Sequence, residues 1–317
     1  MPHSLDAFAA EPAAAAPLVA LVVEGADWHS RMLAQAFAAL GVRTRAISLR
    51  ACAIDTQRPA GLDIAGLGDR LPGAVLVRTM SGGTFQAVTL RLGILHALRE
   101  NGVLVWNDAR AIERCVDKSM TSFLLARGGI PTPATWAVES EEAARAIVGR
   151  ESAQGPLVLK PLFGSQGRGL KLLRSEGDLP NPDAVAGVYY LQRYVGVEGA
   201  DGFRDFRLLV SQGRVVAAMA RQAASWITNV KQGGRPMAVV AGNELNELAV
   251  RAAAAVGANF AGVDILYDAD GHPTVLEVNS MPAWSGLQKV THSRIAAILA
   301  DDLMAAIAAR ARPGATV

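Results

Sequence analysis

Two carboxylates and one side-chain amide near the C-terminal end of the chain could bind a hard divalent cation. They lie in segment 263–279, where Asp270-Gly271 is a strong signal for a two-residue hairpin turn. Counting outward from this turn places Asp264 opposite Glu277, with Asn279 on the same face as Glu277. Facing like charges destabilise a sheet unless something compensates them. Because Mg²⁺ and Mn²⁺ prefer oxygen ligands, we predict a metal site at Asp264, Glu277 and Asn279.

The same count makes further predictions about this hairpin. Leu266 should face Val275 across the two strands. The alternation of side chains predicts a buried opposite face formed by Val263, Ile265, Leu276 and Val278. The competing interpretation is the exposed polar face of an edge hairpin.

A lysine and a glycine-rich loop could bind phosphate. Lys160 ends the apolar stretch 157–159, and the loop Gly164-Ser165-Gln166-Gly167-Arg168-Gly169 follows. Glycines allow tight turns that present backbone N–H groups to an anion, and lysine binds phosphate as a point charge. Lys118 lies at the start of a predicted helix, where the helix dipole favours an anion. The alternatives are a plain flexible loop and a solvated lysine, since the loop is neither a Walker A motif nor a dinucleotide fingerprint.

Two arginines on predicted strands could stabilise a charged intermediate. Asp205 and Arg207 lie on one strand face, and Arg221 ends the next strand, before Asn229 in a polar loop. Arg207 or Arg221 could clamp an acyl phosphate and neutralise charge as it develops. The alternative is a surface salt bridge, which contributes little.

The elements that must position these residues fall into three blocks. Predicted strands at 18–23, 42–49, 74–77 and 103–106 alternate with helices at 29–40 and 88–100, which is typical of βαβ units with a parallel sheet. We therefore predict an open α/β domain over residues 18–112, preceded by a loose tail at 1–17.

The second and third blocks are predicted to be α+β units. Residues 113–188 hold a helix capped by Asp117, a helix capped by Ser140, and strands at 156–162 and 170–173. Residues 189–317 hold strands at 190–195, 205–210 and 215–221, a helix at 243–256, the hairpin, and a final helix from about Ser293.

Composition excludes several classes of protein. The 317 residues are 51% hydrophobic with a net charge of +2, which argues against a dedicated nucleic-acid binder. Two cysteines at unrelated positions argue against a disulfide scaffold and indicate a reducing cytosol, so we expect a cytoplasmic protein. The apolar run 13–23 is too short to span a membrane, which needs about 20 apolar residues, and it lacks the basic start of a signal peptide.

Taken in order, these motifs resemble the ATP-grasp superfamily, and within it the RimK-like α-L-glutamate ligases. The resemblance covers about residues 107–290, with a looser match before them. It is carried by NDARAIERCVDKSMTSFLLARGGIPTP at 107–133, LVLKPLFGSQGRG at 157–169, LQRYV at 191–195, DFRL at 205–208, Thr228-Asn229, and GVDILYDADGHPTVLEVNSMP at 262–282.

The resemblance implies a fold, a reaction and residue roles. ATP would lie between two α+β subdomains that follow the α/β domain, and a carboxylate would react through an acyl phosphate with an amine. Magnesium or manganese, as a pair of ions, would bind Asp264, Glu277 and Asn279. Nucleotide contacts are implied for Lys118, Lys160, Gly164, Ser165, Gln166, Gly167, Gln192, Arg193, Tyr194, Asp205 and Asn229. Arg207 or Arg221 would stabilise the later tetrahedral state.

The acceptor and the amino acid stay open at this point. L-Glutamate is the amino acid implied, and acceptors of the family include tetrahydromethanopterin, carrier proteins and a ribosomal protein tail. Ala283-Trp284 stands where relatives often carry glycine, and the low net charge and Trp226 favour a small-molecule acceptor. The alternatives are a D-alanine-type or glutathione-type ligase, or an ATP-binding regulatory module. A homo-oligomer is compatible with the family, whereas a Rossmann dehydrogenase is excluded because Glu24-Gly-Ala-Asp27 replaces the glycine fingerprint.

Overall fold

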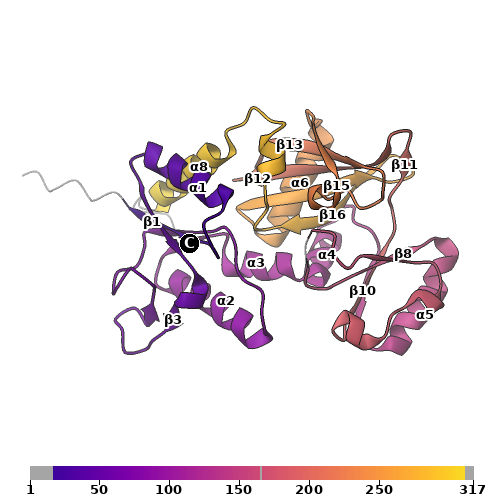
Figure 1. Cartoon of the computed structure of the whole chain (residues 1–317), viewed down its shortest axis with the longest axis horizontal. Coiled ribbons are helices and arrows are strands. Elements are labelled where there is room, and N and C mark those ends of the chain that lie inside the picture. The colour runs from indigo at the N-terminus through magenta and orange to yellow at the C-terminus, as the bar shows by residue number, and fades with distance from the viewer. Residues whose placement is uncertain (1–16, 165, 311–317) are drawn as a thin grey trace, which may run out of the picture.

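The computed structural model describes residues 17–164 and 166–310, so that the predicted tail lies almost entirely outside the described residues, as does Ser165. The elements form three main sheets: a parallel sheet at the N-terminal side, a small antiparallel sheet, and a larger antiparallel sheet (Figure 1). In the described part of the chain, no helix has both the length and the apolar composition needed to cross a membrane.

The N-terminal sheet has the strand order β2-β1-β5-β6, and every neighbouring pair is parallel, which confirms the predicted α/β architecture. Three of its strands, β1, β5 and β6, are apolar because helices cover the sheet, whereas the edge strand β2 carries Arg43, Thr44 and Arg45. The Asp27 side chain and Ser30 form a capping box that begins the first helix, and Thr84 caps the second. The elements are β1 (Leu18–Val22), α1 (Trp28–Ala39), β2 (Arg43–Ile47), β5 (Ala74–Val77), α2 (Phe85–Glu100) and β6 (Leu104–Trp106), with a small hairpin of β3 (Ala53–Ile54) and β4 (Leu62–Asp63).

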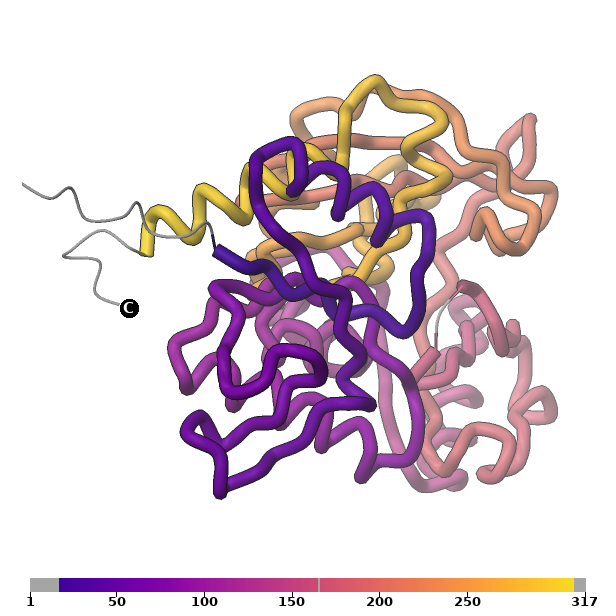
Figure 2. Tube along the Cα trace, turned by 60° about the vertical axis from the view of Figure 1, so that its left-hand side comes forward, coloured from indigo at the N-terminus to yellow at the C-terminus, as the bar shows by residue number. Residues whose placement is uncertain are grey.

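The last helix within the described residues returns to this first sheet. Helix α8 (Ile295–Arg310) packs along α1, as Figures 1 and 2 both show. Its Leu299 and Leu303 belong to the same apolar cluster as Leu33 and Phe37 of α1. That cluster also contains residues of the larger antiparallel sheet, so it joins the first and last parts of the chain.

The central unit is a four-stranded antiparallel sheet with one helix packed on its apolar face. Its strand order is β7-β10-β8-β9, and Ser140 caps the helix that packs on it. Asp117 caps a second helix, as predicted, by accepting hydrogen bonds from the backbone N–H groups of Ser119 and Met120. The elements are α3 (Ala109–Val116), α4 (Lys118–Arg127), β7 (Thr135–Val138), α5 (Glu141–Glu151), β8 (Leu157–Lys160), β9 (Lys171–Leu173) and β10 (Tyr189–Arg193).

The larger antiparallel sheet carries the predicted metal hairpin. Its order is β14-β13-β12-β15-β16, with β11 paired to β12, and helix α6 packs its apolar face against it. The elements are β11 (Glu198–Gly199), β12 (Gly202–Ser211), β13 (Arg214–Ala223), β14 (Arg235–Ala238), α6 (Asn243–Val256), β15 (Phe260–Tyr267), β16 (Pro273–Asn279) and the short α7 (Ser285–Gln288).

The hairpin count is right at the acids and wrong near the turn. Asp264 does face Glu277, but Leu266 faces Thr274 rather than Val275. The turn is one residue longer than predicted, because Asp268 and His272 close it by a backbone hydrogen bond and Gly271 has a φ of 79°. A bulge at Leu276 restores the register at the acids and turns Leu276 into a cavity instead of the buried face.

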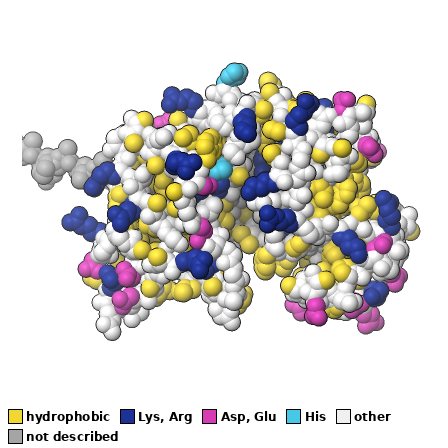
Figure 3. All heavy atoms as spheres, in the orientation of Figure 1, with side chains coloured by type: hydrophobic (Ala, Val, Ile, Leu, Met, Phe, Trp, Pro, Cys, Tyr) yellow, Lys and Arg dark blue, Asp and Glu magenta, His cyan; other side chains and the backbone are white. Residues whose placement is uncertain are grey.

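The surface drawn in Figure 3 carries Lys and Arg side chains scattered among Asp and Glu, rather than gathered in one patch.

Candidate active site

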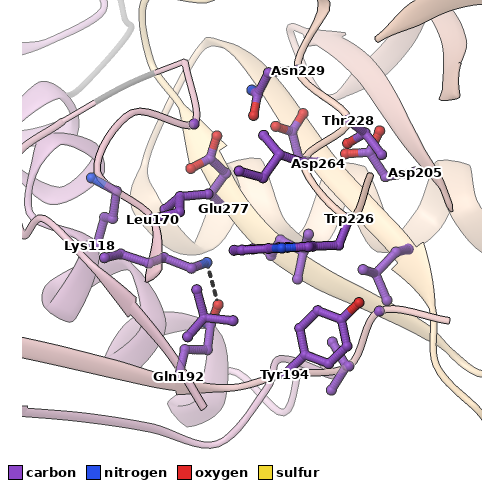
Figure 4. Close-up of a pocket in the computed structure, with 18 of the residues that line it drawn as sticks. Lys118, Leu170, Gln192, Tyr194, Asp205, Trp226, Thr228, Asn229, Asp264 and Glu277 are labelled. Carbon is purple, nitrogen blue, oxygen red and sulfur yellow. Dashed lines mark hydrogen bonds between the residues drawn. The ribbon is translucent and has the colours of Figure 1, made fainter. Parts of the chain in front are cut away.

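A cavity opens between the central antiparallel sheet and the larger one, with about 840 Å³ of empty space that is partly open to solvent. Figure 4 shows side chains from both sheets pointing into it. Most of the predicted site residues line it, namely Lys118, Lys160, Gly164, Gln166, Gly167, Gln192, Arg193, Tyr194, Asp205, Arg221, Asn229, Asp264 and Glu277. The structure thus brings together residues more than a hundred positions apart in the sequence.

Two predicted residues of the described part of the chain are not among those that line the cavity. Arg207 bonds to Asp264, and Asn279 bonds to Glu277, so both lie directly behind a lining residue. Ser165 lies outside the described residues.

The two carboxylates differ in their surroundings. Asp264 is buried, whereas a third of the Glu277 side chain is exposed to the cavity. Asn279 donates a hydrogen bond from Nδ2 to Oε1 of Glu277 at 3.0 Å. The amide oxygen of Asn279 takes no part in this bond. Carboxylate and amide oxygens at these neighbouring positions fit the donor set that a hard divalent cation requires.

Two arginines compensate the buried aspartate. Arg207 binds both carboxylate oxygens of Asp264, at 2.6 and 2.5 Å, and Arg221 lies 3.0 Å from Asp264 while it also binds Asp205. Burial raises the pKa of Asp264, but the two guanidinium groups outweigh burial and hold this pKa well below its usual range. Burial lowers the pKa of Arg221, but Asp264 and Asp205 outweigh it and raise that pKa.

This network is not the surface salt bridge that the sequence also allowed, because Asp205 and Arg221 are 3% and 2% exposed. It supplies the compensation that the facing acids require. A role of Arg207 or Arg221 at an acyl phosphate stays a prediction.

The two lysines occupy the side of the cavity formed by the central unit. The Lys160 ammonium group donates to Oε1 of Gln192 at 2.5 Å, the contact drawn in Figure 4. Desolvation lowers the pKa of Lys160 to about 8, although Glu277 acts in the opposite direction. Lys118 donates to the backbone carbonyls of Pro161, Leu162 and Gly164 at 2.9–3.1 Å, and desolvation lowers its pKa too.

The glycine loop meets the polar loop that follows β13. A side-chain carbon at Gly167 would lie 2.5 Å from Oδ1 of Asn229, and φ at Gly167 is 70°, so only glycine suits this position. Gln232 also donates to the backbone carbonyl of Gln166 at 3.3 Å. The two loops therefore form one cover over the cavity.

The segment expected to meet adenine is partly engaged elsewhere. The Arg193 guanidinium binds the carboxylate of Glu151 and the carbonyls of Glu151 and Gly155, so a nucleotide contact through it would break this ion pair. Tyr194 packs edge-to-face against Trp226, with ring centroids 5.8 Å apart. Figure 4 shows the Trp226 ring lying across the cavity, where a planar group could stack on it.

Several lining residues were not among the predicted site residues. Trp226 was expected at the acceptor, and the structure places it in the cavity beside Tyr194. The available signal is an aromatic residue in the loop between Arg221 and Asn229. The apolar lining residues Val158, Leu170, Leu266 and Leu276 gave no signal, because the same residue types fill any strand.

An α/β domain followed by two α+β units that enclose lysines on one side and paired carboxylates on the other defines an ATP-grasp enzyme. The RimK-like ATP-grasp domain model matches residues 115–303. The chain therefore belongs to the RimK-like ATP-grasp family, and it is an ADP-forming ligase that joins an acid to an amine.

Curated relatives and solved structures agree with this assignment. The tetrahydromethanopterin:α-L-glutamate ligase of Methanosarcina acetivorans is 32% identical over 307 residues, covering 84% of this chain and 92% of the relative. A probable α-L-glutamate ligase of Syntrophotalea carbinolica is 31% identical, covering 91% and 94%. The ATP-grasp ligase PsnB, solved with a minimal precursor, superposes with a TM-score of 0.70 at 23% identity over 92% of this chain and 99% of PsnB, which shows the shared fold.

Proposed function

We propose that the chain is an ATP- and magnesium-dependent α-L-glutamate ligase that adds glutamate to a carboxylate of a small-molecule acceptor of the tetrahydromethanopterin type. The observation that carries this proposal is the meeting of Lys118, Lys160, Asp264 and Glu277 in one cavity. The acceptor class rests on relatives from three methanogens that bear the tetrahydromethanopterin ligase name, at 32–36% identity.

The reaction would take place in two steps. An oxygen of the acceptor carboxylate attacks the γ-phosphorus of ATP, the bond to the bridging oxygen breaks, and an acyl phosphate and ADP result. The glutamate amine then attacks the acyl carbon, phosphate leaves, and the amine loses a proton as the amide forms. A bound divalent ion would supply charge neutralisation to the phosphates.

The residues of this chain would have separate tasks in these steps. The ammonium groups of Lys118 and Lys160 would neutralise phosphate oxygens, while Glu277, Asn279 and Asp264 would hold the metal. Trp226 and Tyr194 would offer ring surfaces to the nucleobase. The glycine loop and the loop of Asn229 would exclude water, which protects an acyl phosphate from hydrolysis.

The decisive experiment is a coupled assay of ADP release over amino acids and acceptors, with mass spectrometry of the product. We expect ADP release only when L-glutamate and a tetrahydromethanopterin-type acceptor are both present, with a product heavier by one glutamyl group. Release with D-alanine, or with a glutathione precursor, would reassign the substrates. Tight nucleotide binding without turnover on any pair would instead support a regulatory module.

Lys160 should give nucleotide binding a characteristic dependence on pH. Because desolvation lowers the pKa of Lys160 to about 8, its ammonium form is present below this pH and is lost above it. We therefore expect the affinity for a non-hydrolysable ATP analogue, measured by calorimetry, to fall about tenfold between pH 7.5 and pH 9.5. The Lys160→Arg variant stays charged over this range, so its affinity should not depend on pH in this way. If the variant lost affinity with pH as the wild type does, Lys160 would not be the group responsible.

A further inference from the structure

The carboxyl edge of the N-terminal parallel sheet does not stand open. In open α/β sheets, ligands usually bind in the crevice outside the carboxyl ends of the strands. Here a loop from the other end of the chain, residues 280–285, lies against that edge. This segment, which we call the 280–285 loop, begins directly after Asn279, the proposed metal ligand that ends β16.

Two residues that follow strands of the N-terminal sheet bind the first part of the 280–285 loop. Asn107, directly after β6, donates from Nδ2 to the carbonyls of Ser280 and Phe260, and accepts from the Phe260 N–H through Oδ1. Arg78, directly after β5, donates from Nη1 to the carbonyl of Met281 at 3.2 Å. Both side chains are buried, so these contacts are not exchanged with bulk water.

His29 binds the second part of the loop. Its Nε2 accepts hydrogen bonds from the backbone N–H groups of Trp284 and Ser285, at 3.1 and 3.2 Å. Nε2 must therefore lack a proton, and Nδ1, 3.1 Å from Asp27, carries it. The Trp284 ring is fully buried, with the imidazole ring edge-on at 4.6 Å and the Arg78 guanidinium 5.2 Å from its centroid.

We propose that His29 and Arg78 are positioning residues that fix the 280–285 loop, and through it hold Glu277 and Asn279 in the arrangement that binds metal. The proposal rests on the metal site of the proposed function. Its physical basis is the order of the contacts. Buried side chains of the N-terminal domain hydrogen-bond to the backbone of residues 280, 281, 284 and 285, and residue 280 directly follows Asn279 in the chain. The end of β16 cannot shift without breaking these buried hydrogen bonds. Groups that contact the residues holding a metal set the orientation of those residues.

Metal binding tests this proposal without requiring turnover. The probe is Mn²⁺ titrated into the full chain with a non-hydrolysable ATP analogue, followed by electron paramagnetic resonance. Substituting the partners of metal ligands typically weakens affinity 10- to 100-fold, so we expect about tenfold weaker Mn²⁺ binding for Arg78→Met and His29→Phe. His29→Phe keeps a ring against Trp284 but removes the acceptor atom.

Matched variants separate positioning from a general loss of structure. His29→Gln keeps an acceptor atom and should restore affinity to within about twofold of wild type. Arg58→Met and His96→Phe remove an arginine and a histidine of the same domain that pair with acids away from the 280–285 loop, and should bind Mn²⁺ as wild type does. Circular dichroism melting of each variant identifies any that fails to fold.

A pH series gives a second readout that a structural role would not move. Burial lowers the pKa of His29 and Arg78 lowers it further, against the effect of Asp27, with Lys231 as the other charged group acting on it. Protonated Nε2 cannot accept from Trp284 and Ser285. Between about pH 7 and about pH 5, wild type should therefore lose more Mn²⁺ affinity than His29→Gln.

The outcomes distinguish this proposal from the function on which it rests. If wild type binds no Mn²⁺, or if Glu277→Ala binds it equally well, the metal assignment itself fails. If Glu277→Ala loses Mn²⁺ binding but folded Arg78→Met and His29→Phe keep wild-type affinity, the metal site stands and the positioning role is overturned.

Discussion

Replacing Glu277 by alanine should abolish ADP release while the protein stays folded. Glu277 is the one carboxylate of the facing pair that is partly exposed to the cavity, and Asn279 already orients it. If Glu277 binds the metal as proposed, its loss should lower kcat by about 10³-fold or more, or about 4 kcal/mol of transition-state stabilisation. Stability should fall little, because the substitution also removes a like charge that faces Asp264.

The comparison that makes this result specific uses two further variants. Glu277→Gln keeps the shape but not the charge and should be nearly as inactive, whereas Glu247→Ala, on the exposed side of α6, should be fully active. Kinetics of ADP release and thermal melting measure both properties. Substantial turnover by folded Glu277→Ala would mean that the metal, if required, binds elsewhere.

Replacing Arg221 by methionine should cost about 3–5 kcal/mol of unfolding free energy, because it leaves the buried acids Asp205 and Asp264 short of a partner. The pKa of Asp264 is held low by Arg207 and Arg221, so its ionised form stabilises the fold above its unfolded pKa, and this stability is lost as pH falls through the folded pKa. Without Arg221 that pKa rises. The deficit of the variant should therefore be greatest near pH 7 and shrink below about pH 4.

Urea denaturation over this pH range measures the deficit directly. Arg214→Met is the matched control, because Arg214 pairs with Asp302 while half of its side chain is exposed, and it should cost less than about 1 kcal/mol at any pH. A deficit of Arg221→Met that is equally small, or independent of pH, would show that the buried network contributes little to stability.

The parts of the fold that depend on local chemistry could be predicted from the sequence. Asp117 and Ser140 mark helix starts because their side chains cap backbone N–H groups within three residues. Three strands of the N-terminal sheet are short apolar runs, and the structure contains all four predicted strands in the predicted parallel arrangement. The pairing of Asp264 with Glu277 could be predicted because only one turn separates them.

Other features depend on contacts that no local pattern encodes. The bulge at Leu276 and the longer turn change the register by one residue each, and the two changes cancel from the acids outward. The short β7 lacks a clear apolar period. Helix α3 was also not predicted, although its sequence is amphipathic and Asp108 caps it. The contacts of His29 and Arg78 with the 280–285 loop span more than 200 positions, and only the folded chain shows that these residues are neighbours.

The packing of α8 on α1 affects the order in which parts of the chain can fold during synthesis. The apolar face that Leu33 and Phe37 share with Leu299 and Leu303 cannot be covered until the final helix has left the ribosome. At roughly 5–20 residues per second, this face of α1 stays uncovered for on the order of ten seconds or more. A ribosome that stalls before α8 is made would therefore hold a nascent chain whose apolar α1 face is exposed. Chaperones that act on emerging chains could bind this face.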